Sequence, residues 1–161
     1  MRGGALPATL LLAALGLALG RASWRAWVGS VIALGGTVAV LSQIKFAHSS
    51  IEIAFLGCWA STAATAASVY LPRSPGMLAG VVLSLNAGLW VSAVVALAGA
   101  PLDLNAAFPA VLLAVPAGWL TRRRASIAVK VACSWLIAIA MLVAALPFLS
   151  TTPGYLPDHL E

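Results

Sequence analysis

Charged side chains are scarce in this sequence of 161 residues. Only 8% of the residues are Asp, Glu, Lys or Arg, and just four of these are acidic. Soluble domains carry roughly 25% charged residues. Hydrophobic residues make up 62% of the chain, and the mean hydropathy is +1.04. The composition therefore excludes a soluble domain and predicts a membrane-embedded protein.

The formal net charge of +5 is not the signature of a nucleic-acid-binding protein. The basic residues lie in short turns between apolar runs, which is the pattern that orients membrane proteins rather than the clustered face that binds phosphates. We therefore expect the lipid bilayer as a partner and no nucleic acid.

Cysteine is also rare. The two cysteines, Cys58 and Cys133, lie inside apolar runs at different expected depths in the membrane. A disulfide needs Cα atoms within about 7 Å, so we expect no pairing. Free cysteines usually behave as small buried hydrophobic residues, and we predict that role for both.

Recognisable catalytic and metal-binding motifs are missing. The sequence has no glycine-rich phosphate loop and no nucleophile elbow, and it has only two histidines. Residues that can bind metals occur close together at only two places, His48 with Glu52 and Asp158 with His159 and Glu161. Neither place has the paired histidines or cysteines of a zinc site. We therefore expect no enzyme activity and no metal, and the sequence does not identify a cofactor.

What the chain does contain is a series of long apolar runs separated by breakers. They predict an all-α bundle of six membrane helices within residues 1–149, or five if the first does not span, followed by an irregular tail over 150–161. The expected spans are 4–20, 27–44, 51–71, 76–99, 106–120 and 126–149.

The first run has two interpretations. Arg2 followed by an apolar stretch resembles a signal peptide, but Arg21 and Arg25 place the stronger positive charge after the run, which reverses the usual order. A retained first helix is the interpretation we favour.

The basic residues predict the orientation of the bundle. Seven of the nine Lys and Arg residues follow odd-numbered spans, and cytoplasmic loops carry the excess of such residues. Both termini are therefore expected on the non-cytoplasmic side, and a bacterial inner (plasma) membrane is the expected location. The seven are Arg21, Arg25, Arg73, Arg122, Arg123, Arg124 and Lys130, and the aromatic residues Trp24, Trp27, Tyr70 and Trp119 fall at the same boundary.

The run 51–71 is expected to be the central helix of the bundle. Its second half contains nothing larger than threonine from residue 60 to 68, and small residues let helices approach closely. We expect this helix to pack against its neighbours, protein partners or a second copy of the chain. The predicted packing residues are Ala60, Ser61, Ala64, Thr65 and Ser68, with Gly35 and Gly36 from the second run.

Interruptions occur at matching places in the two halves of the chain. Gly35 and Gly36 lie in the middle of the second run, and Pro109 and Pro116 lie in the fifth. Broken helices at corresponding positions are typical of transporters with inverted repeats, although the halves share no residue-level similarity.

Three polar residues near the third run are the first candidates for transport. Lys45, His48 and Glu52 have a spacing that places them on one face of a continuous helix. Inside the membrane they would form an ion or proton site. At the interface they would be solvated, with Glu52 at the positive end of its helix.

Asn86 is the one strongly hydrogen-bonding side chain deep in the fourth run. It either bonds a neighbouring helix or belongs to a substrate site. Trp59, Trp90 and Trp135 lie in the middle of their runs, where each indole N–H needs an acceptor. Serines and threonines of the third run are the expected acceptors.

The basic cluster Arg122, Arg123 and Arg124, together with Lys130, is explained by orientation alone or by contact with anionic lipid or an acidic partner. Two functions therefore remain. The first is a non-catalytic accessory or structural subunit of a larger membrane complex. The second is a small solute or ion transporter or channel, with its site near the interrupted second and fifth runs.

Overall fold

The computed structural model describes residues 5–44, 51–72, 76–98, 107–123 and 125–148. Within these ranges the chain forms six α-helices and three short 3-10 helices and contains no strand, which confirms the predicted all-helical fold class. The α-helices are α1 (Ala5–Leu19), α2 (Trp24–Leu41), α3 (Ile51–Ala67), α4 (Met77–Ala98), α6 (Ala114–Arg122) and α7 (Ser126–Ala145). The 3-10 helices are η2 (Ser68–Tyr70), η3 (Phe108–Leu113) and η4 (Leu146–Phe148).

Four helical segments are long and apolar enough to cross a membrane, which is the feature expected of a membrane protein. The helix α1 and the combined η3–α6 segment are apolar but shorter. The four long segments are Trp24–Leu41, Ile51–Tyr70, Met77–Ala98 and Ser126–Phe148.

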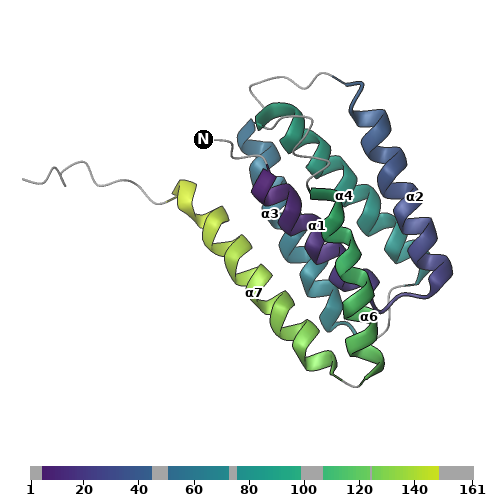
Figure 1. Cartoon of the computed structure of the whole chain (residues 1–161). Helices are drawn as coiled ribbons and strands as arrows, with labels where there is room; N and C mark the ends of the chain where they lie inside the picture. Colours follow the sequence, from purple (N-terminus) through teal and green to yellow (C-terminus); the bar gives the residue numbers. More distant parts are fainter. Residues whose placement is uncertain (1–4, 45–50, 73–75, 99–106, 124, 149–161) are drawn as a thin grey trace, which may run out of the picture.

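The helix at the centre of the bundle is α1, which corrects our expectation for the run 51–71 (Figure 1). It packs against α3, α4, η3, α6 and α7. Its side chains Leu11, Leu15 and Leu19 are all 2% exposed or less. A helix that is apolar all round can be enclosed on every side, and α1 has that composition. In contrast, α3 keeps an outward face, on which Ile53 is 65% exposed.

Two glycines of α1 allow it to lie against η3 and α6. A Cβ atom added at Gly16 would lie 2.9 Å from the carbonyl oxygen of Val111, and one added at Gly20 would lie 2.6 Å from the Cβ of Ala117. Any side chain at either position would therefore push the helices apart. The two segments run in the same direction, since the later glycine meets the later residue.

The closest packing of α2 is against α4, through small residues spaced four apart. Gly80, Ser84 and Gly88 are all buried on α4. A Cβ atom added at Gly80 would lie 2.6 Å from Oγ of Ser30, and one added at Gly88 would lie 2.9 Å from Cβ of Thr37. This small-residue pattern is typical of close helix pairs in membranes, and our sequence reasoning overlooked it.

The two expected interruptions have different outcomes. The helix α2 is continuous through Gly35 and Gly36, and a Cβ atom added at either glycine would have no neighbour within 4 Å, so they mark neither a break nor a close crossing in this chain. Glycine lowers helix propensity by only about 1 kcal/mol, which the remaining apolar helix tolerates. The fifth run does change, from the 3-10 helix η3, which has Pro109 in its first turn, to α6.

The helix α7 lies at the edge of the bundle, on the side away from α2 (Figure 1). It packs mainly on α3, with smaller contacts to α6 and α1. Only one stripe of α7 is buried, formed by Val129, Cys133, Leu136 and Ala140. Its other faces carry large exposed apolar side chains, including Trp135 and Leu142.

Candidate functional site

Asn86 is held at the contact between α3 and α4. Its Nδ2 donates a hydrogen bond to Oγ of Ser61, and its Oδ1 accepts one from Nε1 of Trp90 at 3.1 Å. The Trp90 ring fills the space over Gly57, where any side chain would overlap it. Since residues four apart lie on the same helix face, Gly57 with Ser61 and Asn86 with Trp90 form two matching pairs.

This polar clasp, formed by Gly57, Ser61, Asn86 and Trp90, joins two helices. Both the amide nitrogen and the amide oxygen of Asn86 form hydrogen bonds within the protein. Of the two roles predicted for Asn86, the structure shows a hydrogen bond to a neighbouring helix. The Trp90 indole finds its acceptor in Asn86 rather than in a hydroxyl of α3. The arrangement positions α3 and α4 against each other.

The three polar residues near the start of α3 are described only in part. Lys45 and His48 lie outside the described residues. Glu52 is exposed in the first turn of α3. It lines a groove of about 550 Å³ between the start of α3 and the end of α7, together with aromatic side chains. The residues lining this groove are Ile51, Glu52, Phe55, Leu56, Trp59, Val143, Pro147 and Phe148.

The small residues of α3 are divided between two faces. Ser61 and Thr65 are buried against neighbouring helices, whereas Ala60 and Ala64 are exposed. The hydroxyl of Ser68 donates to the carbonyl oxygen of Thr65 at 2.6 Å. The predicted packing role thus holds within the chain for the buried face, and the two alanines face outward from the bundle.

At the opposite end from Glu52, Arg21 connects the end of α1 to the end of α3. Its Nη1 donates to the carbonyl oxygens of Val69 and of Leu71, the latter at 3.3 Å. Carbonyls at the end of a helix lack partners within the helix, so the guanidinium satisfies groups that α3 and η2 leave open. The hydroxyl of Tyr70 donates to the carbonyl oxygen of Lys130 at 2.7 Å and ties the same end to α7.

The predicted basic cluster is dispersed. The guanidinium of Arg123 lies over the ring of Trp119, 4.7 Å from its centroid, in a cation–π contact. Arg122 lines a groove with Trp119 that also includes the stacked pair of Trp24 and Trp27. Arg124 lies outside the described residues. Lys130 lines a separate pocket, shared with Arg21. Sequence reasoning treated Arg21 only as an orienting charge, because its partners are some fifty residues away.

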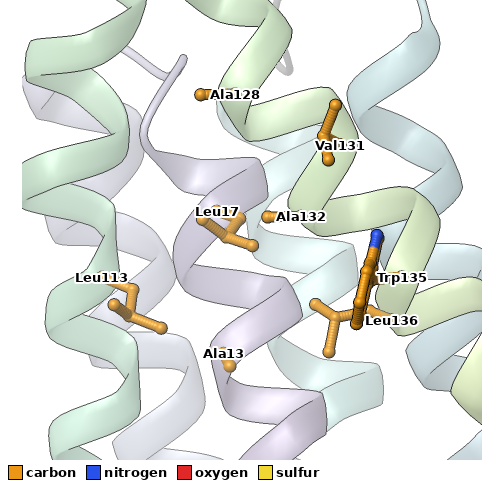
Figure 2. Close-up of a pocket in the computed structure, with 8 residues that line it drawn as sticks. All are labelled: Ala13, Leu17, Leu113, Ala128, Val131, Ala132, Trp135 and Leu136. Carbon is orange, nitrogen blue, oxygen red and sulfur yellow. The ribbon is translucent and has the colours of Figure 1, made fainter.

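An apolar groove lies between α1, η3 and α7, and Figure 2 shows its side chains. Its volume is about 590 Å³, and its lining is almost entirely apolar. Trp135 stands on the α7 side and is 69% exposed. The lining residues are Ala13, Leu17, Leu113, Ala128, Val131, Ala132, Trp135 and Leu136. We call this the α1–α7 groove.

The two cysteines are free and buried, as predicted from their positions in apolar runs. Among the described residues no three His, Cys, Asp or Glu side chains come together as a metal site would require. Comparison with protein-family models, curated proteins and solved structures gave no match.

Proposed function

We propose that this protein is a non-catalytic accessory subunit of a larger membrane complex and that it contacts its partner through the α1–α7 groove. The observation that carries the proposal is Trp135. It stands in the middle of the apolar segment Ser126–Phe148, 69% exposed at the edge of the groove.

The indole of Trp135 needs an acceptor that lipid tails do not provide. No described residue accepts a hydrogen bond from its Nε1, and tryptophan in membrane proteins gathers at the interfaces, where water and headgroups accept such bonds. A helix of another protein seated in the groove supplies both apolar contact and a backbone or side-chain acceptor. Lipid fills such a groove without satisfying the indole.

The proposal includes six membrane crossings with both termini on the non-cytoplasmic side of a bacterial inner membrane. The distribution of Lys and Arg supports this orientation. So does the parallel packing of α1 with η3–α6, which brings Arg21 and Arg122 to the same end of the bundle. The helix α1 is short for a membrane span. Its length need not match the thickness of the lipid, because other helices surround it.

Photo-crosslinking tests the partner proposal in the native membrane. A photoreactive phenylalanine analogue replaces Trp135 in one variant and Ile32 in another. Ile32 is a matched control, since it is 68% exposed but lies on α2, away from the groove. We expect a defined adduct with a different membrane protein from position 135 and none from position 32. An adduct with a second copy of this chain, or no protein adduct at all, contradicts the proposal.

The second candidate function is transport, and the groove containing Glu52 favours it. A carboxylate beside Phe55, Trp59 and Phe148 is suited to an apolar cation, because aromatic faces attract positive charge. Flux of tetraethylammonium, a quaternary cation that crosses lipid bilayers poorly, into proteoliposomes tests this function. Flux that is lost in Glu52→Gln supports transport, and equal flux with and without the protein rejects it for this class of substrate.

A further inference from the structure

A second pocket lies at the basic end of the bundle, where η2, α6, α7 and the residues after α1 meet. Its volume is about 350 Å³, and polar and apolar groups line it in nearly equal measure. Two cations and two hydroxyls contribute to it. The lining residues are Arg21, Val69, Thr121, Ser126, Val129 and Lys130. We call it the basic pocket.

Positive charge in the basic pocket has no described counter-ion. Glu52 is the one acidic residue among those the structure describes, and it lies at the opposite end of α3. Arg25, Arg122 and Arg123 add further positive charge at the basic end. Like charges gathered without carboxylates raise the local potential and attract anions.

Arg21 is oriented by the protein before any ligand arrives. Its Nη1 is fixed by the carbonyl oxygens of Val69 and Leu71. A guanidinium has five N–H donors, so others remain to bind an anion. Ser126 adds a hydroxyl group, whereas the hydroxyl of Thr121 already donates to the carbonyl oxygen of Ala117 at 2.8 Å. Ala125 precedes α7 and provides no side-chain cap for it. Such a set of donors matches the oxygens of a phosphate group.

We propose that the basic pocket binds a phosphate-bearing anion at the membrane surface. Two sources share this chemistry, the headgroup of an anionic phospholipid and free inorganic phosphate. The aromatic side chains Trp24, Trp119 and Tyr70 surround the same end of the bundle. Such residues gather at headgroup depth, which places the pocket where a phospholipid phosphate lies. The proposal is independent of the partner at the α1–α7 groove.

The test measures lipid binding by the purified full-length protein in mild detergent, using native mass spectrometry. The probes are dioleoylphosphatidylglycerol, which is anionic, and dioleoylphosphatidylcholine, which is zwitterionic. Lys130→Gln removes a charge from the pocket, and Arg25→Gln removes an equal charge from an exposed site outside it. Both side chains are exposed, so both variants are expected to fold, and circular dichroism checks this.

We expect the wild type to bind phosphatidylglycerol more tightly than phosphatidylcholine. Lys130→Gln should weaken phosphatidylglycerol binding about fivefold or more, because it removes a charge-assisted hydrogen bond inside the pocket. Arg25 does not line the pocket, so Arg25→Gln should change the binding much less. Equal affinity for the two lipids, or equal loss in both variants, overturns the proposal.

Inorganic phosphate distinguishes the two sources. If millimolar phosphate raises the melting temperature of the wild type but not of Lys130→Gln, and displaces phosphatidylglycerol, then the pocket accepts the free anion. If only the lipid binds with this dependence on Lys130, then the ligand is the headgroup. If neither probe depends on Lys130, the pocket binds no phosphate and the inference is wrong.

Discussion

Gly57 and Trp90 show how one residue depends on another across a helix contact. The indole ring of Trp90 occupies the space that a side chain at position 57 would need, and its N–H reaches Asn86. Asn86 in turn donates to Ser61 on α3. In the membrane such bonds contribute about 0.6 to 2 kcal/mol each, so shape and hydrogen bonding act together at this contact.

Gly57→Ala should therefore destabilise the protein. The added methyl group forces the Trp90 ring out of place, and overpacking of this kind typically costs about 1 to 3 kcal/mol. Adding Trp90→Leu removes the clash, so the cost of Gly57→Ala should be much smaller in that background. Unfolding by SDS in mixed micelles measures both. Equal costs in the two backgrounds would show that the ring and the glycine do not interact.

Part of this residue-scale picture was predictable. Asn86 and Trp90 are polar groups in an apolar run, and a bond to a neighbouring helix was one of two predicted outcomes for the asparagine. The identity of the partner was not predictable. Ser61 is 25 residues away along the chain, and its selection depends on how α3 and α4 are rotated against each other.

At the scale of the element, apolar runs and breakers predicted where helices form but not which helix is central. The run 51–71 has the small residues, yet α1 is enclosed. Lipid tails and buried side chains are equally apolar, so hydrophobicity alone does not mark the face of a membrane helix that packs on protein. Small residues at four-residue spacing do mark it on α4, at Gly80, Ser84 and Gly88.

Two glycine substitutions distinguish the contribution of helix packing to stability from that of helix propensity. Gly88→Ala places a methyl group 2.9 Å from Cβ of Thr37, and we expect a loss of about 1 to 3 kcal/mol. Gly36→Ala meets no neighbour, so it should be neutral or stabilising by up to about 1 kcal/mol through helix propensity. Thermal unfolding of the purified variants gives the comparison. A larger loss of stability in Gly36→Ala than in Gly88→Ala would contradict the close contact between α2 and α4.

At the scale of the whole molecule, the two ends of the bundle differ in charge. Arg21, Arg122 and Lys130 lie at one end, and Glu52 lies at the other. The sequence predicted this asymmetry, because the charges follow alternate apolar runs. It did not predict that Arg21 and Lys130 share a pocket while Arg123 stacks on Trp119, since those contacts depend on how the helix ends converge.

The proposed orientation predicts which exposed positions react in intact cells. Gln43 follows α2 and Pro72 follows η2, and both are exposed. A membrane-impermeant maleimide should label Gln43→Cys in intact cells and Pro72→Cys only after lysis. The native Cys58 and Cys133 are buried and should stay unlabelled in the folded protein. The reverse labelling pattern would show that the protein has the opposite orientation. Labelling of both positions in intact cells would show that positions 43 and 72 lie on the same side of the membrane.

The most direct test of the accessory-subunit proposal is purification from the native membrane in mild detergent, followed by mass spectrometry of the proteins that co-elute. Our account predicts a stable partner in fixed stoichiometry, lost when Trp135→Leu weakens the α1–α7 groove contact but kept in Ile32→Leu on the opposite side. A protein that elutes alone, or only with copies of itself, would contradict the account.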